Sequence, residues 1–158
     1  MLLVELVTVD VIANILGNLA DVQTQFKSTD SLVLTSQERL SPHMLGHTTE
    51  GRTIRLSLPR STELVDGDIL AVDGDVAVVV VAAPEDLFVI TPTNNLAWGM
   101  VGFALGNLHR PVRFNNVSIL TPADDIVADL LRRLEVPFAR RTTPFVGVRS
   151  HFVSGHTH

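Results

Sequence analysis

The first half of the chain alternates apolar and polar residues with the period of a β-sheet. In RTIRLSLPR every second residue is apolar (Ile54, Leu56 and Leu58), as in a strand with one buried face. The next segment, LVDGDILAVDGDVAVVVVAA, has two apolar runs on either side of Asp73-Gly74, a dipeptide that favours a tight hairpin turn. The second run, residues 76–83, has no polar side chain and is predicted to be buried on both faces.

Residues 1–50 carry weaker signals. We expect short strands near residues 2–7 and 32–40. Together with the strands above, they predict an all-β domain over residues 1–84, to which we assign the binding of a partner or client protein.

After residue 84 the pattern alternates between strands and helices. LFVITP (residues 87–92) predicts a strand. NNLAWGMVGFALGN predicts a helix capped by Asn94 or Asn95, with Leu96, Met100 and Phe103 at helical spacing. The segments PVRF and VSILT then flank Asn115-Asn116, which suits a tight hairpin.

A second helix is predicted in TPADDIVADLLRRLEV, with Thr121 as its N-cap and Pro122 at its first position. Its apolar residues form one stripe: Ile126, Val127, Leu130, Leu131 and Leu134. PFARRTT then predicts an edge strand, where Pro137 is tolerated near the start. This order predicts a ferredoxin-like βαββαβ domain over residues 85–145, hence an α+β protein, followed by a flexible histidine-containing tail over residues 146–158.

Composition narrows the chemistry that such a protein can perform. The chain has 158 residues, of which 46% are hydrophobic and 18% charged, so it can bury a substantial core. It has no cysteine, which excludes disulfides, thiolate metal sites and cysteine nucleophiles. Any metal site must therefore use nitrogen and oxygen ligands.

The charge is unevenly distributed. The net charge is −5, yet seven arginines face four acidic residues from His109 onward, whereas 5 basic and 13 acidic residues precede it. This asymmetry suggests two modules with different partners. An RNA-recognition module has the same element order as the second domain, but its central strands need aromatic residues and these offer only Phe114. We expect no nucleic-acid partner.

No segment suits a membrane. The apolar N-terminal stretch lacks basic residues and contains Glu5 and Asp10, unlike a signal peptide. The longest charge-free stretch is interrupted by Pro92, Asn94 and Asn95, which disfavour a membrane span. We expect a cytoplasmic protein.

Motifs for catalysis are also missing. The sequence has no G-x-S-x-G elbow and no glycine-rich phosphate loop, so we expect no enzymatic activity. His43 and His47 are four residues apart, but Pro42 and Gly46 favour a loop over a helix. We interpret both as surface histidines.

Three of the six histidines lie in the last eight residues, HFVSGHTH: His151, His156 and His158. One interpretation is a neutral tail or a remnant of a purification tag. The other is a mobile arm that binds metal. The choice depends on whether the rest of the chain supplies a site for the arm.

His109 is the candidate for that site. It lies in FALGNLHRPVRF, between a predicted helix and a predicted strand. A positively charged histidine there can stabilise the helix C-terminus, or its ring can lie at the surface as a metal ligand. The position alone leaves both roles open.

Several short motifs resemble one known family. GNLHRP is similar to the GNRHxP signature of the UreE urease accessory proteins, which are nickel metallochaperones. PADDIVADLL, thirteen residues after His109, resembles the family's helix that starts with an aspartate, here Asp124. Upstream, LSLPR, LVDGDIL and VVAAPEDL resemble the β-domain stretches of the family, and Pro144-Phe145 resembles its PF after the last strand.

The resemblance implies a fold, a partner and a cargo. The family has an N-terminal β domain and a ferredoxin-like domain through which it forms a homodimer. The counterpart of His109 binds one Ni²⁺ between two chains, and C-terminal histidines, here His158, His156 and His151, supply further ligands. Imidazole also binds Zn²⁺ and Cu²⁺, so these ions are expected substitutes. The implied clients are the urease apoprotein and the urease accessory GTPase complex; a dimeric nickel- or zinc-buffering protein without a client is the alternative.

The chain also departs from the family pattern. Leu108 stands where arginine is common, and Ala104 where many members have a further histidine. Ala123 and Asp125 occupy positions that are histidines in some members, so we expect no strong second site there. The family's PExGAY is replaced by VGVRS, residues 146–150. For Asp124 we favour a role at the helix N-terminus over metal binding.

Overall fold

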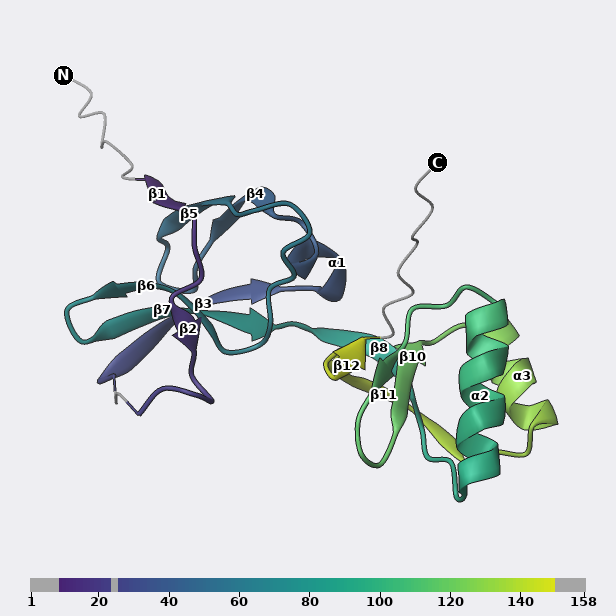
Figure 1. The fold of residues 1–158 in the computed structure, drawn as a ribbon. Helices are drawn as coiled ribbons and strands as arrows, with labels where there is room; N and C mark the ends of the chain where they lie inside the picture. The colour runs from purple at the N-terminus through teal and green to yellow at the C-terminus, as the bar shows by residue number, and fades with distance from the viewer. Residues whose placement is uncertain (1–8, 24–25, 150–158) are drawn as a thin grey trace. The chain divides into compact units, whose positions relative to one another are not determined.

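The computed structural model describes residues 9–23 and 26–149, which form two compact units that divide between Ala83 and Pro84 (Figure 1). The first unit is built mainly of strands, and the second combines a sheet with two helices. The predicted α+β class, with an all-β domain followed by a ferredoxin-like domain, is confirmed.

The first unit contains two sheets and one turn of helix. Its elements are β1 (Val9–Ile12), β2 (Gly17–Asn18), β3 (Ser28–Leu34), α1 (Ser36–Arg39), β4 (His43–His47), β5 (Thr53–Ser57), β6 (Asp68–Asp73) and β7 (Val76–Ala82). One sheet has the order β1-β5-β4 and the other the order β2-β6-β7-β3. Arg52 ties the two sheets together, because it forms ion pairs with Asp10 of β1, Asp30 of β3 and Asp73 of β6 at 3.5, 3.7 and 3.2 Å.

The strands predicted from the sequence pattern of residues 52–83 are confirmed. Ile54, Leu56 and Leu58 are each at most 2% exposed. Strands β6 and β7 form the expected hairpin, in which Gly74 has a φ of +59°. β7 lies between β6 and β3 and is buried on both sides, since alternate residues contribute to two different apolar clusters.

Of the two strands predicted within residues 1–50, one cannot be compared with the structure and the other is only partly correct. The strand expected near residues 2–7 lies outside the described residues. The strand expected over 32–40 is wrong beyond Leu34, because the chain turns there into α1. Thr35 caps α1 reciprocally with Glu38: each residue's side chain accepts a hydrogen bond from the other's backbone N–H. This local capping box competes successfully with continued strand pairing.

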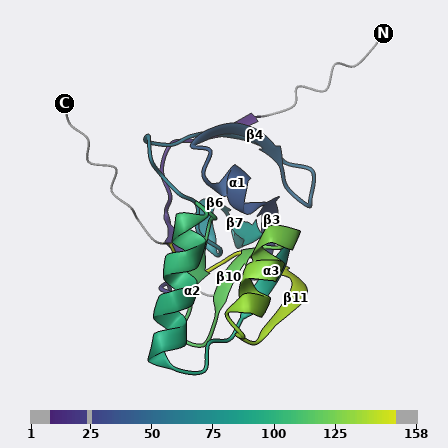
Figure 2. The same cartoon turned by 90° about the vertical axis from the view of Figure 1, so that its right-hand side faces the viewer.

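The second unit has the predicted element order. Its elements are β8 (Pro84–Ile90), α2 (Asn95–Asn107), β9 (Arg113–Phe114), β10 (Ile119–Pro122), α3 (Asp125–Arg133), β11 (Phe138–Pro144) and β12 (Val148–Arg149). The antiparallel sheet has the order β11-β8-β10-β9-β12, which is the ferredoxin-like order with β12 added beside β9. Both helices cover the same face of this sheet (Figure 2).

The helices of this unit begin at caps that only partly match the prediction. Asn94 caps α2 as expected, with its side chain accepting from the N–H of Ala97 at 2.9 Å. Thr121 is not the cap of α3. It lies fully buried in β10, where its hydroxyl donates to the carbonyl of Pro111, and Asp124 caps α3 instead. Tertiary burial of Thr121 overrides its local capping tendency.

The predicted tail also begins differently. The flexible tail is predicted to span residues 146–158, but Val148 and Arg149 form β12 and pair with Phe114 and Arg113 of β9. Residues 150–158 lie outside the described residues.

Candidate metal centre

His109 lies directly beyond the C-terminus of α2. The N–H of His109 donates to the carbonyl of Gly106 at 2.9 Å, and that of Arg110 donates to the carbonyl of Leu105 at 3.1 Å. This pair of bonds is a Schellman motif, which ends a helix when the residue after its cap adopts a left-handed conformation. His109 has a φ of +52° and an exposed side chain. The helix end therefore presents the imidazole to solvent, and no described residue forms a hydrogen bond with it.

The segment after His109 is held against the start of α3. Arg110 forms an ion pair with Asp124 at 3.0 Å, and the hydroxyl of Thr121 donates to Pro111 at 2.9 Å. Asp124 uses one carboxylate oxygen for Arg110 and the other for the N–H of Val127. Both oxygens are thus engaged within the fold, which supports the structural role expected for Asp124.

The remaining predicted ligands are not brought to His109 by the described part of the chain. His151, His156 and His158 lie outside it. Within residues 9–23 and 26–149, no three histidine, aspartate or glutamate side chains are arranged to hold a metal ion. A divalent ion at His109 therefore needs ligands from beyond this range or from a second copy of the chain.

His43 and His47 belong to the other unit. They lie in strand β4, not in the expected loop, because residues 43–47 pair along β5 despite Pro42 and Gly46. Both side chains are exposed, as expected, and Nδ1 of His47 lies 3.2 Å from the hydroxyl of Thr53. Four residues along a strand span about 13 Å, so the two rings are too far apart to share an ion.

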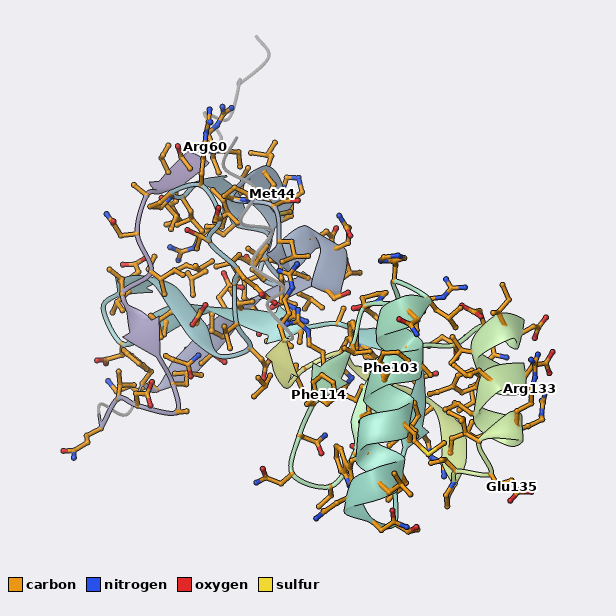
Figure 3. All side chains as sticks on the ribbon, turned by 45° about the vertical axis from the view of Figure 1, so that its right-hand side comes forward. Met44, Arg60, Phe103, Phe114, Arg133 and Glu135 are labelled. Carbon is orange, nitrogen blue, oxygen red and sulfur yellow. The ribbon has the colours of Figure 1, made fainter. Side chains whose placement is uncertain are left out.

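The sequence prediction missed which face of α2 packs inward. Val101 and Leu105 are fully buried against the sheet, whereas Leu96, Met100 and Phe103 are 73%, 46% and 72% exposed. Figure 3 labels Phe103 on this helix and Phe114 on β9. The ring of Phe114 lies against Gly102, on another side of α2. The helix is apolar all round and has no charged residue, a composition that itself indicates burial on more than one side.

This exposed apolar face of α2 (Leu96, Met100 and Phe103) continues at both ends. Leu108, which directly precedes His109, is also exposed, at 39%. At the other end it borders a shallow groove between the start of α2 and the end of α3, lined in part by Leu134 and Pro137. Apolar side chains are thus exposed near both ends of α2, and the last of them, Leu108, directly precedes the candidate ligand.

One electrostatic feature stands apart from this site. Arg140 of β11 forms a two-bonded ion pair with Asp86 of β8, with distances of 2.8 and 2.5 Å. These hydrogen bonds lower the pKa of Asp86 and raise the pKa of Arg140. The pair joins an edge strand to its neighbour and contributes no free ligand.

Among the described residues, no helix is long and apolar enough to cross a membrane.

Known proteins resemble this chain along most of its length. The profile of the UreE urease accessory protein N-terminal domain matches residues 12–83, and that of the UreE C-terminal domain matches residues 85–158. The urease accessory protein UreE of Geobacillus kaustophilus (strain HTA426) is 30% identical over 155 residues, which cover 94% of this chain and 99% of that protein. Its counterpart in Deinococcus radiodurans is 39% identical over 114 residues, 72% of this chain and 74% of that protein. The UreE protein of Lachnoclostridium phytofermentans is 30% identical over 150 residues, 95% and 93% of the two chains.

Proposed function

The chain belongs to the UreE family of urease accessory proteins, and we propose that it is a homodimeric metallochaperone that carries Ni²⁺ at His109 for assembly of the urease active site. UreE proteins are accessory chaperones and not enzymes, so the chemistry required is capture and release of an ion. The observation that carries the proposal is the position of His109, an exposed imidazole at the end of a helix whose apolar face is exposed.

The geometry of His109 suits a ligand that must remain exchangeable. Its backbone N–H is used by the helix end, while its ring projects into solvent. A single imidazole holds a divalent ion weakly, but a two-fold axis beside it supplies a second imidazole from the partner chain. Such a site has few fixed ligands, which leaves room for a transfer partner to displace them.

The exposed apolar face of α2 supports a dimer through this domain. Leu96, Met100 and Phe103 leave more apolar surface in water than isolated surface residues do, and such patches mark interaction sites. Gly99 and Gly106 lie on the same helix, and an added Cβ at either would meet no atom within 4 Å. A glycine within a helix lowers stability by about 1 kcal/mol relative to alanine. Close approach of a second copy of the chain would explain both glycines, since neither is required by contacts within one chain.

The tail histidines complete the proposed coordination. His158, His156 and His151 supply further ligands to the ion that two copies of His109 hold, and Zn²⁺ or Cu²⁺ substitutes for Ni²⁺ because imidazole binds all three. The urease apoprotein and the urease accessory GTPase complex are the proposed recipients.

Nickel titration with sedimentation tests the proposal. We expect the tightest nickel to bind once per two chains, and His109→Asn to abolish this step with the fold intact. Asparagine is the suitable replacement because it tolerates the left-handed conformation and cannot supply an imidazole. His43→Asn, at an exposed strand position, is the matched control and should bind as the natural chain does.

One ion per chain at the tightest step, or unchanged binding by His109→Asn, would contradict the shared site. Transfer of the bound nickel to urease apoprotein distinguishes a chaperone from a nickel- or zinc-buffering protein, which would retain it.

A further inference from the structure

The dipeptide Asp-Gly occurs twice in the chain, as Asp66-Gly67 and Asp73-Gly74. Such a dipeptide can rearrange without an enzyme, because the glycine amide nitrogen can attack the neighbouring carboxyl group and glycine has no side chain to hinder the approach. The attack requires that the glycine N–H is free of any hydrogen bond and that the aspartate side chain can turn toward it. The two copies differ in both respects, so the fold discriminates between them.

The first copy, Asp66-Gly67, is held by hydrogen bonds on several sides. The N–H of Gly67 donates to the carbonyl of Val80 at 2.8 Å. The Asp66 carboxylate accepts from the N–H of Ala82 at 2.7 Å, and the Asp66 carbonyl accepts from the side-chain amide of Asn18 at 2.9 Å. Attack of Gly67 on Asp66 would break the bonds to β7 and leave their partners unsatisfied. The fold therefore protects Asp66.

The second copy, Asp73-Gly74, lies at the turn between β6 and β7 (Figure 1). Gly74 and Asp75 form this turn, and no described residue accepts a hydrogen bond from the N–H of Gly74. An added Cβ at Gly74 would meet nothing within 4 Å, so its surroundings are open. The Asp73 side chain is 72% exposed and pairs with Arg52 at 3.2 Å. Because ion pairs at the surface are weak, this contact leaves the carboxylate free to turn.

We propose that Asp73 is a site of spontaneous isomerisation to isoaspartate, whereas Asp66 is protected from it. The nitrogen of Gly74 bonds to Cγ of Asp73, and one carboxyl oxygen leaves as water with the carboxyl proton and the amide proton. The product is a cyclic imide. Neither His109 nor nickel takes part in this reaction.

Water then opens the imide, with its oxygen bonding to a carbonyl carbon and one hydrogen returning to the nitrogen. Cleavage of the bond from the nitrogen to Cγ restores aspartate. Cleavage of the bond to the backbone carbonyl carbon instead leaves the main chain running through Cβ and Cγ, which is isoaspartate. Water is released in the first step and consumed in the second, so the conversion needs no other reactant.

Isomerisation would alter the place where the hairpin closes. It adds a methylene group to the main chain and leaves the free carboxylate on Cα. Asp73 pairs with Val76 across the turn, and its carboxylate is one of three that Arg52 holds between the two sheets. The isomerised chain should lose this ion pair and the last pairing of β6 with β7, so it should unfold at a lower denaturant concentration.

The test ages the full-length folded protein and the same protein in denaturant side by side, in neutral buffer. Endoproteinase Asp-N, which cuts before aspartate and not before isoaspartate, locates the change. Transfer of a labelled methyl group from S-adenosylmethionine by an isoaspartyl methyltransferase measures its amount. In the denatured chain Asp66 and Asp73 should isomerise at similar rates, because neither is held. In the folded protein only Asp73 should isomerise.

Asp73→Glu separates this reaction from other damage. It should abolish the isoaspartate signal of the folded protein, because attack on a glutamate carboxyl group closes a larger ring that forms more slowly, while a carboxylate remains available to Arg52. Asp75→Glu is the matched control in the same turn. Asp75 is exposed but precedes Val76, whose branched side chain hinders attack, so this variant should keep the full signal.

Equal isomerisation of Asp66 and Asp73 in the folded protein would overturn the proposal. So would the absence of isoaspartate at Asp73 under conditions in which the denatured chain forms it. Aged natural protein should unfold at a lower denaturant concentration than fresh protein, whereas Asp73→Glu should unfold at the same concentration before and after ageing. An equal decrease in both proteins would overturn the effect assigned to the hairpin.

Discussion

His109 holds a backbone conformation that most side chains avoid, and so does Glu135 at the end of the next helix. Their φ values are +52° and +53°. Glu135 follows α3 as His109 follows α2: its N–H donates to the carbonyl of Arg132, and the N–H of Val136 donates to that of Leu131. Glycine is favoured at this position because it has no Cβ. The strain at Glu135 shows that such a conformation does not by itself identify a ligand; His109 is distinguished by its imidazole and by the exposed apolar face of the helix that it follows.

Paired glycine substitutions separate strain from function. His109→Gly and Glu135→Gly should each raise the free energy of unfolding of the metal-free protein by about 0.5–1 kcal/mol, because each relieves left-handed strain. Only His109→Gly should lose nickel. Denaturant unfolding followed by the fluorescence of Trp98, the single tryptophan, reports on this unit. A less stable His109→Gly, or nickel loss in Glu135→Gly, would show that the helix end has a different role.

At the scale of elements, strands and turns whose sequence signals lie within a few residues were predicted correctly. Alternation in β5 and the Asp73-Gly74 turn are local features, and the structure contains both. The position of His109 between helix and strand was also predicted, because Asn94 caps α2 and Pro111 lies shortly after its end. These signals were sufficient to infer the fold class.

Features that depend on distant partners were not predictable in the same way. α2 is apolar on every side, so periodicity could not show that Val101 faces the core while Phe103 faces solvent. The same limit applies within α3, where Ile126 was placed in the apolar stripe but is 60% exposed. The pairing of β12 with β9 joins segments more than thirty residues apart, and the strand is too short to have a pattern of its own.

The Asp86–Arg140 pair gives the sheet a specific response to acid. Because the pKa of Asp86 is lowered in the folded protein, its contribution to stability is present above about pH 4, the ordinary range of aspartate. It is lost as the pH falls through the lowered pKa. We expect Asp86→Asn to destabilise the protein near neutral pH and to match the natural chain in very acidic solution, as measured by thermal unfolding across pH.

Asp129→Asn controls for removal of one surface charge, since it breaks the exposed ion pair with Arg132 inside α3. High salt should also reduce the effect of Asp86→Asn near neutral pH, because exposed charges are screened. A difference between Asp86→Asn and the natural chain that persists unchanged into acid would exclude the ion pair as its cause.

At the scale of the whole molecule, the proposed site and the proposed interface depend on each other. One chain supplies a single exposed imidazole at the end of α2, and the same helix carries the exposed apolar face. Covering that face with a second copy would bury apolar side chains and bring two imidazoles near one axis at once. Nickel and association should therefore stabilise each other, because the ion binds the dimer in preference to the monomer.

Phe103→Glu tests this coupling without altering a ligand. Phe103 is 72% exposed, so the charge should leave the folded chain intact, yet it would lie within the proposed interface. A charge at a central aromatic position should cost at least about 2 kcal/mol of association, which weakens the dimer by roughly thirtyfold. Nickel affinity should fall more than tenfold although His109 is retained, and added nickel should drive the variant back toward dimer in sedimentation equilibrium.

Val117→Glu, at a 70% exposed position in the turn between β9 and β10, should change neither property. A Phe103→Glu protein that stays dimeric and binds nickel normally would place the two-fold axis away from α2.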